Sequence, residues 1–325
     1  MKILRWFAYL LLNLLILIAF AWAFGALYYD GPSKLFAAVN LLGILAAFVF
    51  LRPCWRKLSV FGIWFAVVLG WWLTLKPSAQ GKWQADVAQL PWAEIAGDEI
   101  TIHNVRNFDY RTETDFTQRW ETRKLRLSQL TGIDVFMNYW GSPWMAHPIV
   151  SFQFADSAPI CFSIETRKKD GQSYSAIGGL YRQYNLTYIV SEERDVVRVR
   201  TNYRKGEEAY LYRTRAGLVQ TRQRFLEYIR SINQLHNKPY WYNAVVTNCT
   251  TGIRSQHPAA ERMPWDWRLL VNGKADELMY ERKTIETCSL PFVELKRRAL
   301  INSAAQAANH AADFSTRIRE GRPGM

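Results

Sequence analysis

The chain has only four cysteines among 325 residues, and no two of them form a Cys-X-X-Cys pair. Cysteines so few and scattered exclude a disulfide-rich scaffold and a cysteine-rich zinc site. The five histidines also fall in no spacing typical of metal ligands. We therefore expect no metal and no cofactor. In an oxidising compartment, Cys161 and Cys288 could pair and leave Cys249 as a free thiol.

Long apolar runs are missing from the sequence after Lys76, and all of those present lie before it. Three runs are apolar enough to cross a membrane, which takes about 20 residues per helix. They are Phe7–Tyr28, Leu35–Leu51 and Leu58–Leu75. No small-residue cleavage site follows the first run, which argues against a removed signal peptide. The sequence predicts a three-helix membrane anchor over residues 1–76 and a second domain over residues 77–325.

Acidic residues are scarce beside basic ones, 28 against 41, which gives a net charge of +13. Residues 1–75 carry +5 of this charge, so the rest of the chain carries +8. A basic domain beside a membrane meets anionic lipid headgroups, which attract each nearby cation by about 1 kcal/mol. No helix-turn-helix, zinc-finger or RNA-binding motif is present, so nucleic acid is not an expected partner.

The charges that flank the apolar runs predict the orientation of the anchor. Short loops rich in Lys and Arg stay in the cytoplasm. Such residues precede the first run and separate the second from the third, whereas the loop Asp30–Lys34 has a single cation. The basic residues on the predicted cytoplasmic side are Lys2, Arg5, Arg52, Arg56 and Lys57. Three crossings predict a multi-pass protein of the bacterial inner membrane with its C-terminal domain in the periplasm.

The second domain is predicted to be of the α+β class. Alternating apolar patterns predict strands at Glu99–His103, Asp134–Tyr139, Ile149–Phe154, Ile160–Ile164, Leu186–Ile189, Val196–Arg200 and Ala209–Tyr212. The charged stretch Asn107–Lys124 is expected to be a loop or irregular hairpin. Apolar residues at helical spacing from Leu218 to Leu235 predict an amphipathic helix. Another helix is expected to begin near Cys249, and a basic helix to cover Phe292–Ile318.

His147 and Cys249 are the residues whose chemistry suits catalysis. A thiol attacks as the thiolate, which forms beside an imidazole or at a helix N-terminus because these lower its pKa. Asn248, directly before Cys249, resembles the capping residue at the start of a helix. By spacing alone, a buried cysteine and a structural histidine are the simpler interpretation, since free cysteine is among the most buried residue types.

Nearly all of the second domain, from about Trp83 to Arg319, resembles the Lnb N-terminal periplasmic domain family. The matching motifs are Tyr139-Trp140-Gly141-Ser142, Ala146-His147, Ser163-Ile164-Glu165-Thr166-Arg167, Glu193-Arg194-Asp195, Arg200-Thr201-Asn202, Trp241-Tyr242-Asn243 and Asn248-Cys249-Thr250-Thr251. The resemblance implies a permuted papain-like (NlpC-like) domain of antiparallel sheet plus helices, in which the histidine precedes the cysteine. Asn248-Cys249 is also similar to the Asn-Cys motif of lecithin:retinol acyltransferase.

The same resemblance implies a Cys-His thiol acyltransferase that N-acylates bacterial lipoproteins. His147 would remove the proton of Cys249, whose thiolate would attack an acyl ester and then pass the acyl group to an amine. The expected partners are a phospholipid acyl donor, lipoproteins as acceptor and the membrane. Two alternatives stay open: a periplasmic thiol hydrolase acting as a peptidoglycan peptidase or amidase, and a non-enzymatic membrane-assembly protein.

Several further polar residues are candidates for the site. Ser163 and Glu165 lie two positions apart on a predicted strand and so share a face, where either could orient His147. Arginine binds phosphate through its planar guanidinium group. The candidates for substrate binding are Asn248, Arg167, Arg194 and Arg200. The alternative interpretation is that these charges form ion pairs, as Glu165 with Arg167 and the cluster around Arg194 suggest.

Overall fold

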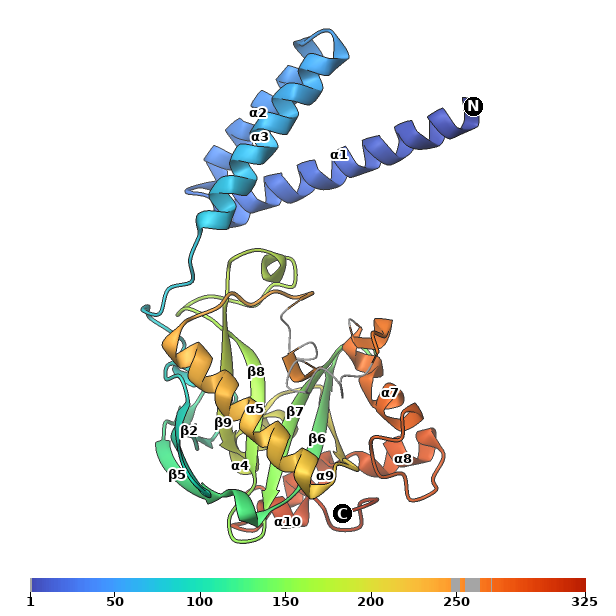
Figure 1. The fold of residues 1–325 in the computed structure, drawn as a ribbon. Coiled ribbons are helices and arrows are strands. Elements are labelled where there is room, and N and C mark those ends of the chain that lie inside the picture. Colours follow the sequence, from blue (N-terminus) through green and yellow to red (C-terminus); the bar gives the residue numbers. More distant parts are fainter. Residues whose placement is uncertain (1, 247–251, 255–263, 270) are drawn as a thin grey trace. The chain divides into compact units, whose positions relative to one another are not determined.

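The computed structural model describes residues 2–246, 252–254, 264–269 and 271–325 (Figure 1). Contacts divide the chain into two compact units. The first, here called the helical unit, comprises Met1–Ser78, Ser173–Asn185 and Trp241–Ala244. The second, the sheet unit, comprises Ala79–Gln172, Leu186–Tyr240 and Val245–Met325. The helical unit therefore includes two short pieces that follow the first strands of the sheet in the sequence.

Three apolar helices dominate the helical unit. They are α1 (Lys2–Asp30), α2 (Lys34–Phe50) and α3 (Cys54–Thr74). The 29 residues of α1 and the 21 of α3 give helices of about 43 and about 31 Å, enough for a hydrocarbon core of about 30 Å. The 17 residues of α2 reach only about 25 Å. Within the described residues, α1 and α3 are thus the two helices long and apolar enough to cross a membrane.

An eight-stranded sheet forms the centre of the sheet unit, with strand order β1-β2-β9-β8-β7-β6-β10 and β5 paired to β2. Its strands are β1 (Trp92–Ala96), β2 (Glu99–Arg106), β5 (Trp120–Arg126), β6 (Leu130–Trp140), β7 (Ala146–Phe154), β8 (Ile160–Arg167), β9 (Asn185–Glu192) and β10 (Glu207–Arg213). A separate hairpin joins β3 (Asp109–Tyr110) to β4 (Phe116–Thr117). Strands β8, β7, β6 and β10 pair in antiparallel fashion, whereas β2 and β9 pair in parallel.

Helices surround this sheet. They are α4 (Glu193–Val196), a π-helical turn (Val199–Tyr203), α5 (Leu218–Asn237), α7 (Ala275–Glu281), α8 (Phe292–Ala299), α9 (Asn302–Ala307) and α10 (Phe314–Arg317). Short 3₁₀ turns lie at Ala85–Val87, Leu127–Gln129, Gly178–Leu180, Trp267–Leu269 and Asn272–Lys274.

Both faces of the sheet are covered, and every residue of β7 is buried. On one face α5 crosses the strands, as Figure 1 shows, and its Phe225 packs edge-on against Phe152 and Phe162. On the other face, Ile149 and Cys161 belong to an apolar cluster with α4, α9 and α10. Successive side chains of a strand point to opposite faces, which explains why β7 and β8 supply both clusters. The described sheet unit is therefore of the predicted α+β class.

A buried group of charges holds the C-terminal helices on this second face. Arg319, just after α10, donates to Asp134 of β6 (Nη2–Oδ2 2.8 Å) and to Glu193 of α4 (Nη2–Oε1 2.6 Å). Both carboxylates are fully buried. Removing one partner of a buried ion pair typically costs about 3–5 kcal/mol. The residues after 300 are therefore part of the fold.

The structure corrects two predicted elements. The predicted strand Val196–Arg200 is instead helical, spanning the end of α4 and the π-helical turn. Arg198 and Arg200 are buried in ion pairs. In the sequence they alternate with apolar residues, which is the pattern of a strand with one face in solvent, and this explains the wrong prediction. The predicted helix Phe292–Ile318 is three helices, because the chain pairs with β10 at Leu300 before it resumes.

Other predictions have mixed outcomes. The helix from Leu218 is present, and the irregular hairpin is present as β3 and β4, whereas β1 and β5 are not anticipated by the sequence. The predicted helix near Cys249 is described only at residues 252–254, which are helical. Cys161 is buried and Cys288 exposed, and neither forms a disulfide.

Candidate active site

His147 lies within strand β7, where it pairs with Asn138 of β6, rather than just before the strand as predicted. The Nδ2 group of Asn138 donates to the backbone carbonyl of His147 at 2.9 Å. On its other side, β7 pairs with β8 so that Ile149 is opposite Ser163. In this antiparallel register, the residue two positions before Ile149 is opposite the residue two positions after Ser163, so His147 lies beside Glu165. The backbone therefore sets the position of the imidazole.

The imidazole of His147 contacts both of the residues predicted to orient it. Its Nε2 lies 2.6 Å from Oγ of Ser163 and 3.0 Å from Oε1 of Glu165. The Ser163 hydroxyl donates to the same carboxylate oxygen at 2.7 Å, so it is placed to accept from an Nε2–H. In that tautomer Nδ1 carries the lone pair of the neutral ring. The three side chains thus form one hydrogen-bonded group that holds the ring in a single orientation.

Arg200 extends this group. Its Nη2 donates to Oε1 of Glu165 at 3.1 Å, and its Nη1 donates to Oε2 of Glu207 at 3.2 Å. Arg200 comes from the π-helical turn and is buried, and Glu207 is the first residue of β10. The sequence predicts Arg200 only as a substrate-binding residue. It does not predict a role for Glu207, because no local feature distinguishes Glu207 from its neighbour Glu208.

The charges around Glu165 keep it ionised. Burial alone would raise the pKa of this carboxyl, but the imidazolium charge and hydrogen bond of His147, then Arg200 and Ser163, hold the pKa well below its usual range. A carboxylate beside an imidazole orients the ring and stabilises the imidazolium that forms when the ring takes a proton. The arrangement is that of a general base supported by a fixed negative charge.

The other two candidate arginines lie apart from this group. The guanidinium of Arg167 donates to the carbonyls of Val87 (3.0 Å) and Ala88 (2.7 Å) and stacks on Trp83. Burial lowers the pKa of Arg167 to about 10. Arg194 is partly exposed, with its Nε 3.9 Å from a carboxylate oxygen of Glu192. Arg167 therefore fastens residues 83–88, which lie between α3 and β1 in the sequence, to β8. Of the three arginines, Arg200 is the one that reaches the partners of His147.

The candidates Asn248 and Cys249 lie outside the described residues. Gly252, three residues after Cys249 in the sequence, lies against β8, since a Cβ there would be 2.6 Å from Cδ1 of Ile164. Ile253 packs into the same apolar cluster, on the face covered by α5. Ile164 stands between the partners of His147 on β8 but points to the opposite face. These neighbours of Cys249 thus pack against the strand that carries Ser163 and Glu165, on the face opposite those two side chains.

Exposed apolar side chains precede His147. Trp144 and Met145, in the turn between β6 and β7, are 51% and 47% exposed. Residues 271–274 clamp this turn: Gly273 donates from its N–H to the carbonyl of Trp144 at 3.0 Å, and Asn272 Oδ1 accepts from the N–H of Ala146 at 2.9 Å. The turn offers an apolar surface that is held in place at the end of the strand carrying the histidine.

The close approach at this turn requires glycine at residue 273. A Cβ there would lie 2.3 Å from the backbone carbon of Trp144, so Gly273→Ala is expected to lower the free energy of unfolding by about 1–3 kcal/mol. Urea unfolding of the detergent-solubilised chain measures this change. Gly132→Ala is the control, because the nearest atom to a Cβ at Gly132 would be Nη1 of Arg213 at 3.8 Å, an ordinary contact, so it should change stability by less than about 0.5 kcal/mol. Equal stability of both variants would contradict the clamp.

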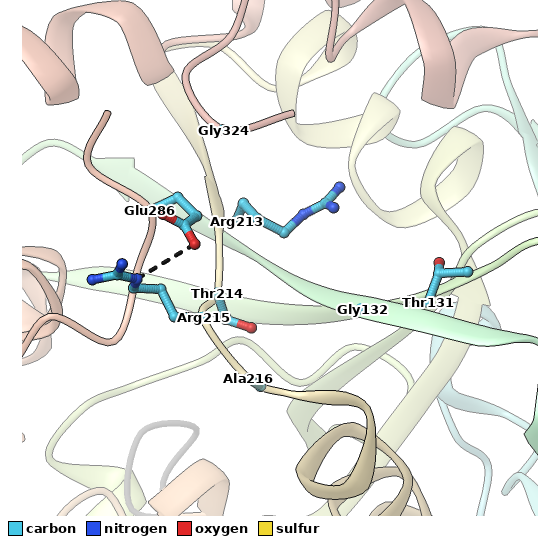
Figure 2. A pocket seen from close by; sticks show the side chains of 8 residues that line it. All are labelled: Thr131, Gly132, Arg213, Thr214, Arg215, Ala216, Glu286 and Gly324. Carbon is cyan, nitrogen blue, oxygen red and sulfur yellow. Dashed lines mark ion pairs between the residues drawn. The ribbon is translucent and has the colours of Figure 1, made fainter. Parts of the chain in front are cut away.

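A separate hollow of about 380 Å³ lies on the sheet unit (Figure 2). It is lined by Thr131, Gly132, Arg213, Thr214, Arg215, Ala216, Glu286 and Gly324. Figure 2 shows Arg215 directed at Glu286, with Nε 3.4 Å from Oε1, and Arg213 is paired with Asp134. No sequence-predicted site residue lines this hollow, so it has no part in the chemistry of His147.

Comparison with known proteins identifies one family. Residues 116–273 match the family model of the Lnb N-terminal periplasmic domain. This confirms the predicted resemblance over a stretch that holds the whole His147 group and Cys249, although it is shorter than the predicted Trp83–Arg319. No curated protein and no solved structure matches the chain. Together with the two long apolar helices, the match indicates a membrane-associated periplasmic domain.

Proposed function

On the premise that residues 116–273 belong to the Lnb N-terminal periplasmic domain family, we propose that this chain is a membrane-anchored acyltransferase. In this proposal it N-acylates the lipid-modified N-terminal cysteine of lipoproteins through a thioester on Cys249. The observation that carries the proposal is the group of His147, Ser163 and Glu165, in which an ionised carboxylate supports an imidazole. The order of histidine before cysteine fits a permuted papain-like fold.

The proposed anchor is multi-pass. Helices α1 and α3 have the length of full spans, and α2 at about 25 Å would cross with local thinning of the bilayer, at a modest cost per ångström of mismatch. Basic residues in the first turns of α1 (Lys2, Arg5) and around the junction of α2 and α3 (Arg52, Arg56, Lys57) support a cytoplasmic position of those ends. Three crossings of the inner membrane would then leave the sheet unit in the periplasm.

The proposed chemistry has two steps. Nδ1 of His147 takes the proton of Cys249, and the thiolate attacks the carbonyl carbon of a phospholipid ester. The C–O bond breaks, and His147 returns the proton to the departing lysolipid alkoxide. The lipoprotein amine then attacks the thioester carbon and the C–S bond breaks, which leaves an amide and restores the thiol after proton transfer through His147. The backbone N–H of Cys249 is the proposed oxyanion donor.

The surroundings of the site favour a lipid over a cell-wall peptide. The exposed Trp144 and Met145 directly precede the strand of His147, where an acyl chain gains contact that a polar stem peptide does not. An enzyme for stem peptides would also gain little from an anchor at the bilayer. In the proposed reaction Glu165 is not a proton carrier, since its role is to hold the ring and balance the imidazolium charge.

Mass spectrometry of lipoprotein N-termini tests the proposal. Cells that lack the chain should accumulate lipoproteins with a free α-amine, and restoring the full chain should acylate that amine. The purified chain in phospholipid vesicles should form an acyl thioester that hydroxylamine cleaves. Unchanged N-termini would reject the acyltransferase, and cleavage of peptidoglycan stem peptides by the purified chain would favour the hydrolase instead.

A further inference from the structure

A segment from the middle of the sequence belongs to the helical unit. This segment, here called the collar, is Ser173–Asn185. It is held to Trp241–Ala244 by backbone hydrogen bonds from the N–H of Tyr242 to the carbonyl of Tyr184 (2.9 Å) and from the N–H of Ala244 to the carbonyl of Gly179 (2.8 Å). The collar and its partner segment therefore form one body with the apolar helices.

Tyr181 fixes the collar to α1. Its ring stacks on Tyr29 with 5.0 Å between ring centroids, and only 8% of the residue is exposed. Its hydroxyl reaches Gly25, where a Cβ would lie 1.8 Å from the oxygen. Because Gly25 precedes the end of α1 by five residues, the ring lies about 7.5 Å along the helix from its last residue. The collar thus lies alongside the end of α1, not beyond it.

Asp30 ties the collar to both long helices. This carboxylate, at the end of α1, accepts from the indole N–H of Trp72 on α3 (2.7 Å), from the backbone N–H of Arg182 (3.0 Å) and from the side-chain amide of Gln183 (2.7 Å). The guanidinium of Arg182 also lies 4.0 Å from the centroid of the Trp72 ring. The collar is therefore held where α1 ends and α3 carries its tryptophans.

Apolar side chains of the collar remain uncovered in this position. Ile177 is 60% exposed and Leu180 is 39% exposed. They precede Tyr181 in the collar, and Tyr181 itself packs into a cluster with aromatic side chains of α1 and α3 that include Trp22, Trp71 and Trp72. Tryptophan gathers where a membrane meets water, so this cluster marks the level of the headgroups. Side chains attached at that level meet lipid.

We propose that the collar is a lipid-contacting element that inserts Ile177 and Leu180 among phospholipid acyl chains of the outer leaflet. This inference rests on the membrane-anchored part of the proposed function and not on its acyl-transfer step. The partner segment of the collar ends at Ala244, five residues before Cys249 in the sequence. The collar, which would contact lipid, is thus hydrogen-bonded to the segment that leads to the proposed nucleophile Cys249.

Photo-crosslinking tests the inference in the full chain. The amino acid p-benzoylphenylalanine replaces Ile177, or replaces Ile95 as the control, since Ile95 is an isoleucine of similar exposure (50%) on the sheet unit. The chain is placed in vesicles of phosphatidylethanolamine and phosphatidylglycerol that contain a tagged phospholipid. Illumination should give at least about tenfold more lipid adduct at 177 than at 95, as expected of a membrane-inserted apolar residue. Equal adducts at both positions, or none at 177, would overturn the inference.

A second variant tests whether the collar depends on its attachment. Tyr181→Ala should reduce the adduct at 177 severalfold while the helices stay resistant to carbonate extraction, whereas Tyr240→Ala, at a half-exposed tyrosine of the sheet unit, should not. An adduct unchanged by Tyr181→Ala would overturn the role of that ring. Acylation of lipoprotein is measured separately in the same vesicles. Crosslinking without acylation would defeat the proposed function and leave the collar intact.

Discussion

Replacement of His147 by alanine is expected to lower the rate of the proposed lipoprotein acylation by roughly 10³-fold, because it removes the proposed base that generates the thiolate. Cys249→Ala is expected to have at least as large an effect. Since nucleophile and base act as a unit, the double variant should be no slower than Cys249→Ala alone. The measurement is a time course of N-terminal acylation by the purified full chain in phospholipid vesicles, read by mass spectrometry.

Matched controls separate this effect from general damage. Cys288 and His310 are exposed and outside the His147 group, so Cys288→Ala and His310→Ala should keep the wild-type rate within about twofold. Losses that multiply in the double variant would mean that the two residues act independently. Activity surviving in Cys249→Ala would remove the thioester from the mechanism.

Arg200→Met is expected to lower the free energy of unfolding by about 3–5 kcal/mol at pH 7. The substitution leaves the carboxylates of Glu165 and Glu207 without the cation between them. The rate of acyl transfer should fall as well, because the pKa of Glu165 beside His147 would then be lowered less strongly. Arg194→Met is the control from the same helical segment: its loose, partly exposed contact with Glu192 should contribute about 0–1 kcal/mol.

The pH dependence of this loss has a definite sign. The pKa of Glu165 is lower in the folded chain than its ordinary value, so its stabilising contribution is present above that ordinary value. The contribution is lost as the pH falls through the folded pKa. The gap in stability between wild type and Arg200→Met should therefore be full at neutral pH and narrow in acid. Thermal unfolding in detergent across this range measures it, and a gap that widens in acid would contradict the ion pair.

How far the sequence predicts this site is clearest on β8. The alternation of side chains along β8 correctly predicts that Ser163 and Glu165 share a face, because side chains of a strand point to alternate faces even where both faces are buried. The alternating pattern gives a wrong prediction at Val196–Arg200, because its arginines are buried in ion pairs and not exposed to solvent. A pattern of polar and apolar residues does not distinguish a charge that faces water from one that faces another charge.

Long-range pairing is the other limit of the sequence. Arg200 meets Glu165 across a separation of 35 residues, and the collar joins the apolar helices over a separation of about 150 residues. Local periodicity carries no information on such partners. The three apolar helices, in contrast, are predicted by hydropathy alone, although α2 is shorter than a full span.

The ion pairs of Arg319 bear on how the protein is made. Asp134 and Glu193 both lie within the stretch that matches the family, whereas Arg319, which pairs with both of them, lies beyond residue 273, where that stretch ends. During synthesis Asp134 gains a cation partner once Arg213 has been made, but the buried Glu193 waits for Arg319. A gene cut back to residues 116–273 would make this transient state permanent, and a stop codon placed before codon 319 is expected to destabilise the sheet unit in the same way.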